Sequence, residues 1–485
     1  MIPVAAPTWR YLVIKMKIVI VARYNQRFLG NFASRVPGCP GKTVDKTRYC
    51  DQSVVVLQIC HNTRGVMEYI KRALDQTLIK SGRTFKAVLV TGPRQVGKTT
   101  ILEETFSEIP QITFDDKIQL RNAISDPVLF LRDNPPPVVL DEIQYAPGLF
   151  PEIKRLCDGG KEYGRYFLTG SRQYNMMENV VESLSGRVAI HELQGLSMRE
   201  IKAVDFNRPF VPTENYFIER KKSLIQYDEI WRRIHRGFNP ELQMPEKDWE
   251  TYWSSYVQTY VERDVSQIIN LKDKMAFITF MTALAARTGQ ILNYSAVADE
   301  VGKTAATIKE WVSVLQSSGL VFLLQPYSAS ALNRAIKTPK IYFRDTGLAC
   351  FLTRWLTPET LRVSAMNGNM FETFVVGEVL KSFSNAGSDY RFSVFYYRGK
   401  DKKRVRRNGT TESTESEIDL IINENGILYP IEIKMSANPD ASMAGAFDVL
   451  DIDKTRIRGK GVIICLYDRL VHLKENLLAV PIEYI

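Results

Sequence analysis

The sequence predicts an α/β fold with a mostly parallel β-sheet near its start, followed by smaller domains. Two observations support this fold class. Short apolar runs alternate with helical segments, which is the pattern of strands covered by helices on both faces of a sheet. The first of these runs ends in a glycine-rich turn that leads into a helix. With 485 residues, the chain is long enough for about three domains.

The predicted strands of this sheet follow one another between residues 87 and 190. Each is short and apolar, as strands buried on both faces are. A helix is predicted from Thr99 to Phe106, and an earlier one from Met67 to about Lys80. The strands are predicted at Ala87–Val90, Gln111–Phe114, Val138–Glu142, Tyr166–Ser171 and Val188–Ile190.

The composition indicates a folded protein in a reducing compartment. Hydrophobic residues make up 45% and charged residues 24% of the chain, which is ordinary for a globular protein. Six cysteines are too few for a disulfide scaffold. No apolar run approaches the roughly 18 residues that cross a membrane. We therefore expect a cytoplasmic protein with no membrane partner.

The net charge of +10 comes mainly from residues 1–66, which hold ten Lys and Arg against two acids. We interpret this segment as an atypical basic extension, or as the product of a start codon assigned too early. The alternative is a zinc site built from Cys39, Cys50, Cys60 and His61. The spacing of these cysteines fits no Cys-x-x-Cys pattern, which argues against that alternative.

Residues Gly92–Thr99 match the pattern G-x-x-x-x-G-K-[ST], the phosphate-binding loop (P-loop) that joins a strand to a helix. The glycines let backbone amides wrap the phosphates, whose charge the helix amino terminus favours. Lys98 reaches the β- and γ-phosphates, and the hydroxyl of Thr99 binds Mg²⁺. The predicted cofactors are therefore ATP and Mg²⁺. The expected nucleotide-binding residues are Gly92, Arg94, Gly97, Lys98, Thr99 and Thr100.

Two acidic residues end the strand predicted at Val138–Glu142. Asp141 is placed to hold the Mg²⁺ together with Thr99, and Glu142 is placed to orient and deprotonate the attacking water. A second acid after the aspartate favours hydrolysis over simple nucleotide storage.

Two further residues are candidates for the catalytic site. Ser171, at the end of the next strand, can contact the γ-phosphate or the water as a sensor, or it can cap a helix. Arg187 can supply the cation that stabilises the transition state, in cis or from a neighbouring subunit. An ordinary surface arginine is the alternative interpretation of Arg187.

Together, these motifs resemble those of the AAA-type P-loop ATPases, common in archaea and bacteria, that carry a C-terminal domain of unknown function. The resemblance covers about residues 67–485, and members of the family usually begin near the equivalent of Met67. It implies ATP binding, ATP hydrolysis and an AAA-like core. The motifs that carry it are Gly92–Thr99, Leu140–Gln144, Leu168–Ser171, Ser183–Arg187, Tyr260–Asp264 and Tyr342–Leu348.

The domain boundaries that we expect are an ATPase core at 67–200 and a helical lid or linker at 201–273. A winged-helix-like region follows at 274–360, because two helices joined by a tight turn precede an apolar strand. Basic residues there are balanced by acids, so a winged helix that contacts protein is as consistent with the sequence as one that reads DNA.

The last part of the chain, 361–485, resembles the restriction-endonuclease-like nuclease fold. A glutamate on a helix is followed by an aspartate on one strand and by Glu-x-Lys on the next, a set that can hold Mg²⁺ and orient water. The alternative is an inactive fold. We interpret the segment Arg398–Arg407, rich in Lys and Arg, as a basic loop beside this site. The candidate nuclease residues are Glu378, Asp419, Glu432 and Lys434.

The function that we expect is a Mg²⁺-dependent ATPase that acts on nucleic acid or is regulated by it. One alternative is a nucleotide-dependent switch that binds protein partners and whose nuclease-like domain is inactive. Another is an ATP-gated DNA nuclease. The partners considered are ATP, DNA, a protein partner or further copies of the chain. An assay of ATP turnover with and without DNA distinguishes the first two.

Overall fold

The computed structural model divides into two units, Met1–Glu68 and Tyr69–Ile485. It describes residues 10–14, 17–23, 54–58, 69–171, 183–265, 273–328, 338–405, 411–451 and 457–485. In the first unit, an antiparallel sheet joins the strands β1 (Arg10–Ile14), β2 (Lys17–Arg23) and β3 (Val54–Gln58). The four residues of the alternative zinc site lie outside the described residues.

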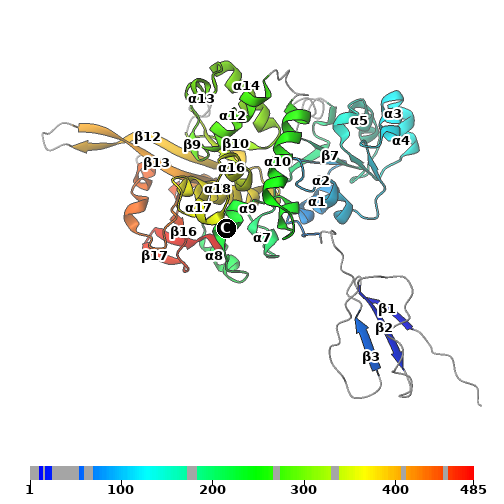
Figure 1. The fold of residues 1–485 in the computed structure, drawn as a ribbon, viewed down its shortest axis with the longest axis horizontal. Helices are drawn as coiled ribbons and strands as arrows, with labels where there is room; N and C mark the ends of the chain where they lie inside the picture. Colours follow the sequence, from blue (N-terminus) through cyan, green and yellow to red (C-terminus); the bar gives the residue numbers. More distant parts are fainter. Residues whose placement is uncertain are drawn as a thin grey trace, which may run out of the picture. The chain divides into compact units, whose positions relative to one another are not determined.

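The second unit begins with a five-stranded parallel sheet (Figure 1). Its spatial order is β5-β6-β7-β4-β8, so the first strand lies between the last two. All five predicted strands are confirmed. They are β4 (Ala87–Gly92), β5 (Gln111–Thr113), β6 (Val138–Asp141), β7 (Tyr166–Ser171) and β8 (Val188–Glu192).

Helices cover both faces of this sheet. Successive residues of β4 point to opposite faces, so Val88 belongs to one apolar core and Leu89 to the other. The helices α1 (Asp75–Gly82) and α2 (Lys98–Thr105) pack on the first face. The second face is covered by α3 (Lys117–Ser125), α4 (Pro127–Asp133) and α5 (Leu149–Gly159).

The helix predicted from Met67 begins later than expected, at Asp75. Residues 69–74 are not helical, and two of them bind a distant glutamate. The guanidinium of Arg72 and the backbone amide of Ala73 both donate to Glu200 Oε1, each at 2.9 Å. The amphipathic pattern was therefore a correct indicator of a helix but a poor indicator of its start.

Helices dominate the next part of the unit. They are α7 (Met198–Ile201), α8 (Glu214–Lys221), α9 (Ile230–Arg236) and α10 (Trp249–Thr259), which continues as a π-helix at Tyr260–Val265. Three further helices follow, interleaved with short strands: α12 (Lys274–Ala285), β9 (Gln290–Ile291), α13 (Tyr294–Val301), α14 (Ala305–Ser317), β10 (Val321–Leu324) and β11 (Lys340–Phe343). The strands form an antiparallel sheet in the order β10-β11-β9.

The last part of the unit is a mixed sheet packed against a long helix, α18 (Asn367–Asn385), which follows α16 (Thr346–Leu352) and α17 (Pro358–Arg362). The main strand order is β12-β13-β14-β16-β18-β17, with β15 paired to β14. The strands are β12 (Val394–Val405), β13 (Thr411–Glu424), β14 (Ile427–Ile433), β15 (Ile457–Arg458), β16 (Gly461–Cys465), β17 (Val471–Lys474) and β18 (Leu477–Pro481). One apolar core runs from Met198 to Ile485 and joins this sheet to the helical part.

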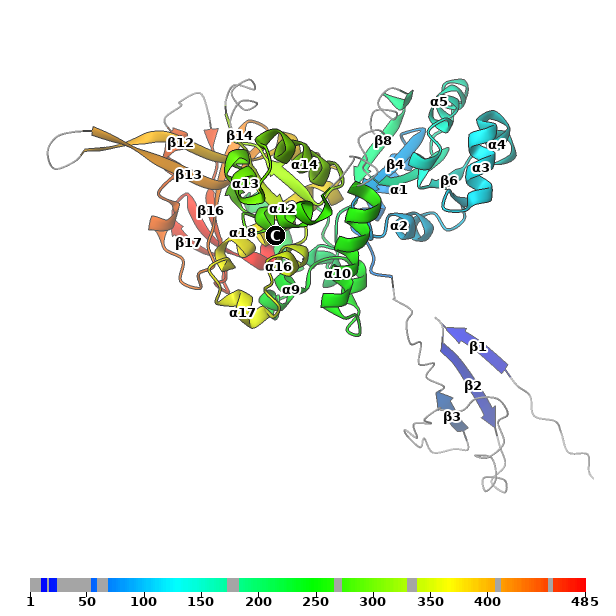
Figure 2. The same cartoon turned by 45° about the horizontal axis from the view of Figure 1, so that its top comes forward.

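The prediction of a basic loop at Arg398–Arg407 is wrong over the residues that the structure describes. β12 continues to Val405 and pairs with β13 as far as Thr411. Figures 1 and 2 both show this hairpin extending beyond the rest of its sheet. The strand is not evident from the sequence because this stretch of mostly charged residues has no apolar face.

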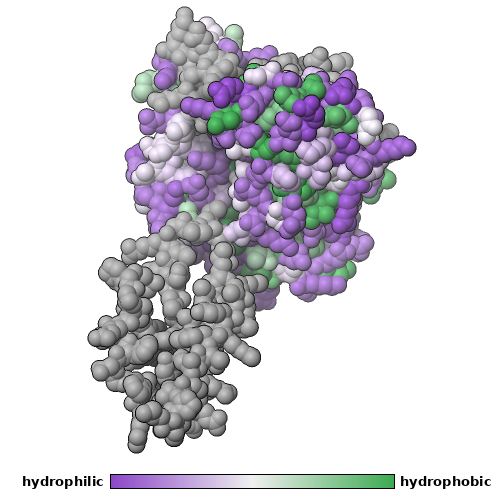
Figure 3. All heavy atoms as spheres, turned by 90° about the vertical axis from the view of Figure 1, so that its right-hand side faces the viewer, coloured by the Kyte–Doolittle hydropathy of each residue, from purple (hydrophilic) through white to green (hydrophobic). Residues whose placement is uncertain are grey.

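The surface on the side of α3 and α4 mixes hydrophobic and hydrophilic residues (Figure 3). Ile118 and Ile124 of α3 and Val128 of α4 are among the exposed large hydrophobic residues. Over the described part of the chain, no helix combines the length and the apolar character needed to cross a membrane.

Candidate nucleotide site and carboxylate cluster

The P-loop follows β4 and takes its shape from two glycines. A Cβ at Gly92 would lie 2.0 Å from the carbonyl oxygen of Leu193, so only glycine allows this close approach of two backbone segments. Gly97 has a left-handed conformation with a φ of 88° and begins α2. Lys98 is buried, and its ammonium group donates to the carbonyl oxygen of Pro93 at 2.8 Å, which holds the ammonium group over the loop.

The amino terminus of α2 fits a phosphate group. The N-cap residue is Gly97, and no side chain caps the first backbone amides of the helix. Such amides carry a partial positive charge and bind anions. Arg94 and Thr100 lie half-buried in the same loop and first turn. The predicted nucleotide-binding residues are therefore brought together.

The two predicted Mg²⁺ ligands are in direct contact. The hydroxyl of Thr99 donates to Asp141 Oδ1 at 2.7 Å. The hydroxyl of Thr169 donates to the same oxygen at 2.5 Å. Asp141 is only 4% exposed, so these hydrogen bonds orient a buried carboxylate toward the P-loop. A hydroxyl and a carboxylate are ligands that Mg²⁺ accepts.

Glu142 is held beside this carboxylate. It has a left-handed backbone with a φ of 57°, which is costly for a residue with a Cβ. Its amide donates to the hydroxyl of Thr169 at 3.0 Å, and its carboxylate accepts a hydrogen bond from the side chain of Gln144. Thr169 therefore fixes both acidic residues.

The sequence-based choice of Ser171 missed Thr169, the residue with these contacts. The side chain of Ser171 lies outside the described residues, so its sensor role stays a prediction. The signal for Thr169 was present, because it is a polar residue within the apolar strand β7 and is 0% exposed. A buried hydroxyl in such a position needs a hydrogen-bond partner.

Arg187 lies at the amino-terminal end of the parallel strands, and the P-loop lies at the opposite end. Its carbonyl oxygen accepts from the amide of Ala87, the first residue of β4, whereas the P-loop follows the last. The length of β4 separates these points by about 16 Å. The guanidinium of Arg187 forms an ion pair with Asp158. It does not meet its own P-loop in this arrangement, so a role toward a neighbouring subunit and the role of an ordinary surface arginine paired with Asp158 both stay open.

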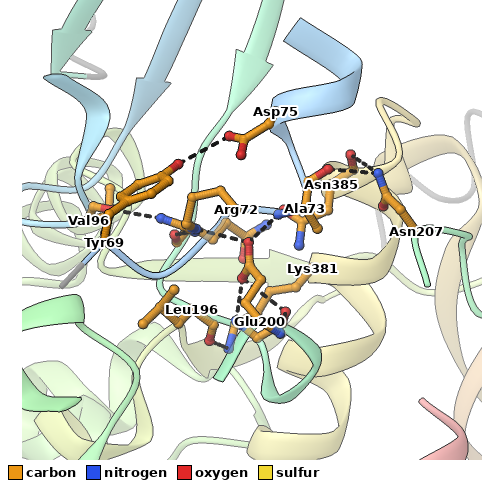
Figure 4. Close-up of polar contacts among 12 residues, drawn as sticks. Tyr69, Arg72, Ala73, Asp75, Val96, Leu196, Glu200, Asn207, Lys381 and Asn385 are labelled. Carbon is orange, nitrogen blue, oxygen red and sulfur yellow. Dashed lines mark hydrogen bonds and ion pairs between the residues drawn. The ribbon is translucent and has the colours of Figure 1, made fainter. Parts of the chain in front are cut away.

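A buried ionic network lies behind the P-loop (Figure 4). The guanidinium of Arg72 pairs with Glu200 and donates to the carbonyl oxygen of Val96 at 2.8 Å, within the loop itself. It also donates to the carbonyl oxygen of Gln194 at 2.7 Å. Burial alone would raise the pKa of Glu200, but the charge of Arg72 and several hydrogen bonds lower it. These contacts favour the charged form of Glu200 inside the protein.

The assignment of Glu378 to a nuclease site is wrong. Glu378 is 4% exposed and belongs to the part of the network on α18. Its carboxylate forms an ion pair with Lys381 at 2.8 Å and accepts from the amide of Met198 at 2.9 Å. Lys381 in turn donates to the carbonyl oxygen of Leu196 at 2.9 Å. Glu378 joins α18 to the start of α7 instead of binding substrate.

The glutamate of α18 that faces the strands is Glu372. It is six residues before Glu378, which places the two side chains about 120° apart around the helix. The ammonium group of Lys340 lies 3.2 Å from Glu372 Oε1 and 3.9 Å from Asp419 Oδ1. The hydroxyl of Tyr342 donates to Glu372 at 2.6 Å. The glutamate of α18 that meets the strands therefore lies in a different turn from Glu378.

The other three candidate residues are brought together. The ammonium group of Lys434 lies 2.5 Å from Glu432 Oε1 and 3.8 Å from Asp419 Oδ2. With Glu372 and Lys340, they form what we call the carboxylate cluster. Among the described residues, no group of three or more His, Cys, Asp or Glu side chains is arranged to hold a metal ion. In this structure, lysine ammonium groups contact the carboxylates of the cluster.

The carboxylate cluster is electrostatically unusual. Burial and then the charge of Asp419 raise the pKa of Glu372 and of Glu432 to about 7. Burial opposes the charge of Lys340, but the surrounding carboxylates outweigh it and raise the pKa of its ammonium group. One oxygen of Glu432, Oε2, is buried and has no hydrogen-bond partner. An unpaired buried carboxylate oxygen is uncommon outside functional sites.

Comparison with known families confirms the AAA-type core. A family model described as an AAA domain matches residues 84–202. Two models described as domains of unknown function match residues 227–359 and 367–485. These latter matches do not identify a winged helix or a restriction-endonuclease-like domain.

Similar proteins carry no function over to this chain. Uncharacterized proteins of Mycobacterium bovis and Mycobacterium tuberculosis are each 26% identical over 400 residues, covering 82% of this chain and 80% of theirs. A solved Walker-type ATPase of Pyrococcus abyssi is 15% identical, with a TM-score of 0.35 over 59% of this chain and 96% of that one. DnaA of Aquifex aeolicus with bound AMPPCP is 12% identical, with a TM-score of 0.25 over 50% and 85% of the two chains.

Two variants on α18 distinguish the structural role of Glu378 from that of Glu372. Glu378→Gln leaves the buried ammonium group of Lys381 without its charged partner, and we expect it to reduce the free energy of unfolding by about 3 kcal/mol. Glu372→Gln removes a charge that burial disfavours. Between pH 4.5 and 7, folded wild-type protein keeps a proton on Glu372 that the unfolded chain has lost, so wild-type stability falls as pH rises.

The midpoint of thermal unfolding, measured at pH 5 and pH 8, checks this prediction. Glu372→Gln should unfold at a higher temperature than wild type at pH 8, with a smaller difference at pH 5. Glu378→Gln should unfold at a lower temperature at both. The assignment is wrong if the two variants exchange these behaviours.

Proposed function

We propose that this protein binds and hydrolyses Mg²⁺-ATP at the carboxyl edge of its parallel sheet and that nucleic acid regulates the activity. The observation that supports hydrolysis most directly is the contact of Thr99 with Asp141 beside the uncapped amino terminus of α2. Parallel strands end at the same edge, which is where such folds bind their ligands.

Each residue of the site has a distinct role in this proposal. Lys98 and the amides at the start of α2 bind the phosphates. Thr99 and Asp141 hold Mg²⁺, which when bound neutralises charge on the phosphates. Glu142 accepts the proton of the attacking water, and Thr169 keeps Glu142 and Asp141 in place. Arg187 serves a neighbouring subunit if the protein assembles into oligomers.

The nucleic-acid part of the proposal depends on two features outside the core. Between α12 and β11, helices and strands alternate in the order helix, strand, helix, helix, strand, strand, which is the order of a winged helix. Residues 398–407, most of which belong to β12, carry seven Lys and Arg but one acid, whereas the paired strand β13 adds Glu412, Glu415 and Glu417. Basic strands bind phosphate groups without sequence preference.

The carboxylate cluster supports a second candidate function, Mg²⁺-dependent cleavage of nucleic acid. Carboxylates and a lysine converge on the same face of the sheet, and the unpartnered oxygen of Glu432 can accept a ligand. The rival is an inactive domain that binds nucleic acid or protein. In that case, the contact of Lys434 with Glu432 only neutralises a buried charge.

Two substitutions separate nucleotide binding from hydrolysis. Lys98→Ala removes a charge-assisted contact with the phosphates and should weaken ATP binding by about 10- to 100-fold. Glu142→Gln should keep ATP affinity and reduce kcat by about 100-fold, since a general base acts only in the chemical step. ATP titration and turnover, with and without DNA, measure both effects. Equal loss of binding in the two variants would overturn the role of Glu142.

The nuclease candidate is tested by Asp419→Ala. Any Mg²⁺- or Mn²⁺-dependent nicking of single-stranded, duplex or branched DNA should disappear, while ATP turnover stays at the wild-type level. Glu378→Gln, measured at a temperature where it is folded, is the matched control and should still nick DNA. Nicking that survives Asp419→Ala comes from another protein, and no nicking by wild type favours the inactive domain.

A further inference from the structure

Three residues in the outer turn of the P-loop, residues 93–96, are contacted from outside the parallel sheet. Val96 receives the hydrogen bond from Arg72 that is described above. Gln95 receives a hydrogen bond from Tyr252 on α10, whose hydroxyl donates to Gln95 Oε1 at 2.9 Å. Pro93 meets Gly319, where a Cβ would lie 3.0 Å from the proline ring. The last two contacts come from the region matched only by a domain of unknown function.

The contact with Gln95 acts on a strained point of the loop. Gln95 has a φ of 60°, a left-handed conformation that residues with a Cβ adopt at a cost. Tyr252 is 6% exposed, and its hydroxyl also accepts from the side-chain amide group of Asn239 at 2.7 Å. Because this hydroxyl is fixed by a buried partner, it holds the side chain of Gln95 in a defined position.

The contact with Pro93 also depends on α10, the helix that carries Tyr252. Gly319 ends the turn after α14 with a φ of 76°, so glycine suits the turn both by its conformation and by the close approach of the proline. The neighbouring Ser318 is hydrogen bonded to the hydroxyl of Tyr260 at 2.7 Å. Tyr260 directly follows α10, about two helical turns after Tyr252. One helix therefore supports both contacts.

We infer that Tyr252, Tyr260, Ser318 and Gly319 form a bracket that holds the outer turn of the P-loop in the shape that binds phosphate. In this inference, Tyr252 is a positioning residue that acts through Gln95, and it touches no nucleotide. The region 227–359 thereby gains a role in ATP affinity, although it lies outside the AAA domain. The inference rests on the proposed ATP binding.

A double-mutant cycle tests the bracket. Tyr252→Phe keeps the ring but removes the hydroxyl, and Gln95→Ala removes the acceptor on an exposed side chain. Each should raise the Kd for Mg²⁺-ATP about fivefold, the effect of one hydrogen bond. Because both remove the same contact, the double variant should equal either single variant. Tyr294→Phe, on α13 of the same region, is the matched control and should leave Kd unchanged.

Each outcome of this cycle either supports or overturns the bracket. Non-additive effects on Kd with unchanged kcat support the bracket, because a general loss of stability from Tyr252→Phe would add to the effect of Gln95→Ala. Multiplicative effects, or a wild-type Kd in Tyr252→Phe, overturn it while leaving ATP binding intact. Wild type that does not bind Mg²⁺-ATP at all overturns the proposed function and the bracket with it.

Discussion

The buried carboxylate of Asp141 is the feature on which the nucleotide site depends. It accepts hydrogen bonds from Thr99 of the P-loop and Thr169 of β7, so it joins β6 to the neighbouring strand β7 and to the first turn of α2. A carboxylate that is 4% exposed is costly to keep charged unless donors surround it. The two hydroxyls meet this requirement and orient the group. The position of Glu142 follows, because its amide binds the same threonine.

Buried charges also connect the ATPase core to the rest of the chain. Arg72 and Glu200 lie against the P-loop, and Lys381 and Glu378 continue the network into α18. Removing one partner of such a pair leaves an unpaired buried charge, which lowers the stability of the folded protein. The core and the helical part are thus joined by directional contacts as well as by apolar packing. The conformation of the P-loop therefore depends on contacts from outside the AAA domain as well as on the domain itself.

Local patterns predicted what depends on local sequence. The strands of the parallel sheet, the P-loop and the pair Asp141 and Glu142 all follow from short apolar runs and from the residues that end them. Contacts between distant segments were not predictable in the same way. Arg187 directly precedes β8 but lies at the opposite end of the strands from the P-loop. Thr169 can contact Asp141 only because β7 pairs with β6. The sequence indicates a glutamate on α18 but not which turn faces the strands, because the rotation of a helix relative to a sheet cannot be derived from sequence spacing; the structure places Glu372 there and not Glu378.

The central claim is that the P-loop, Thr99 and Asp141 form a Mg²⁺-ATP site. A crystal structure with a non-hydrolysable ATP analogue and Mg²⁺ tests it most directly. The account predicts phosphates against the amides of residues 97–99 and a metal about 2.1 Å from the hydroxyl oxygen of Thr99, on the side of Asp141. A triphosphate bound elsewhere, or a metal that contacts neither residue, would contradict the account.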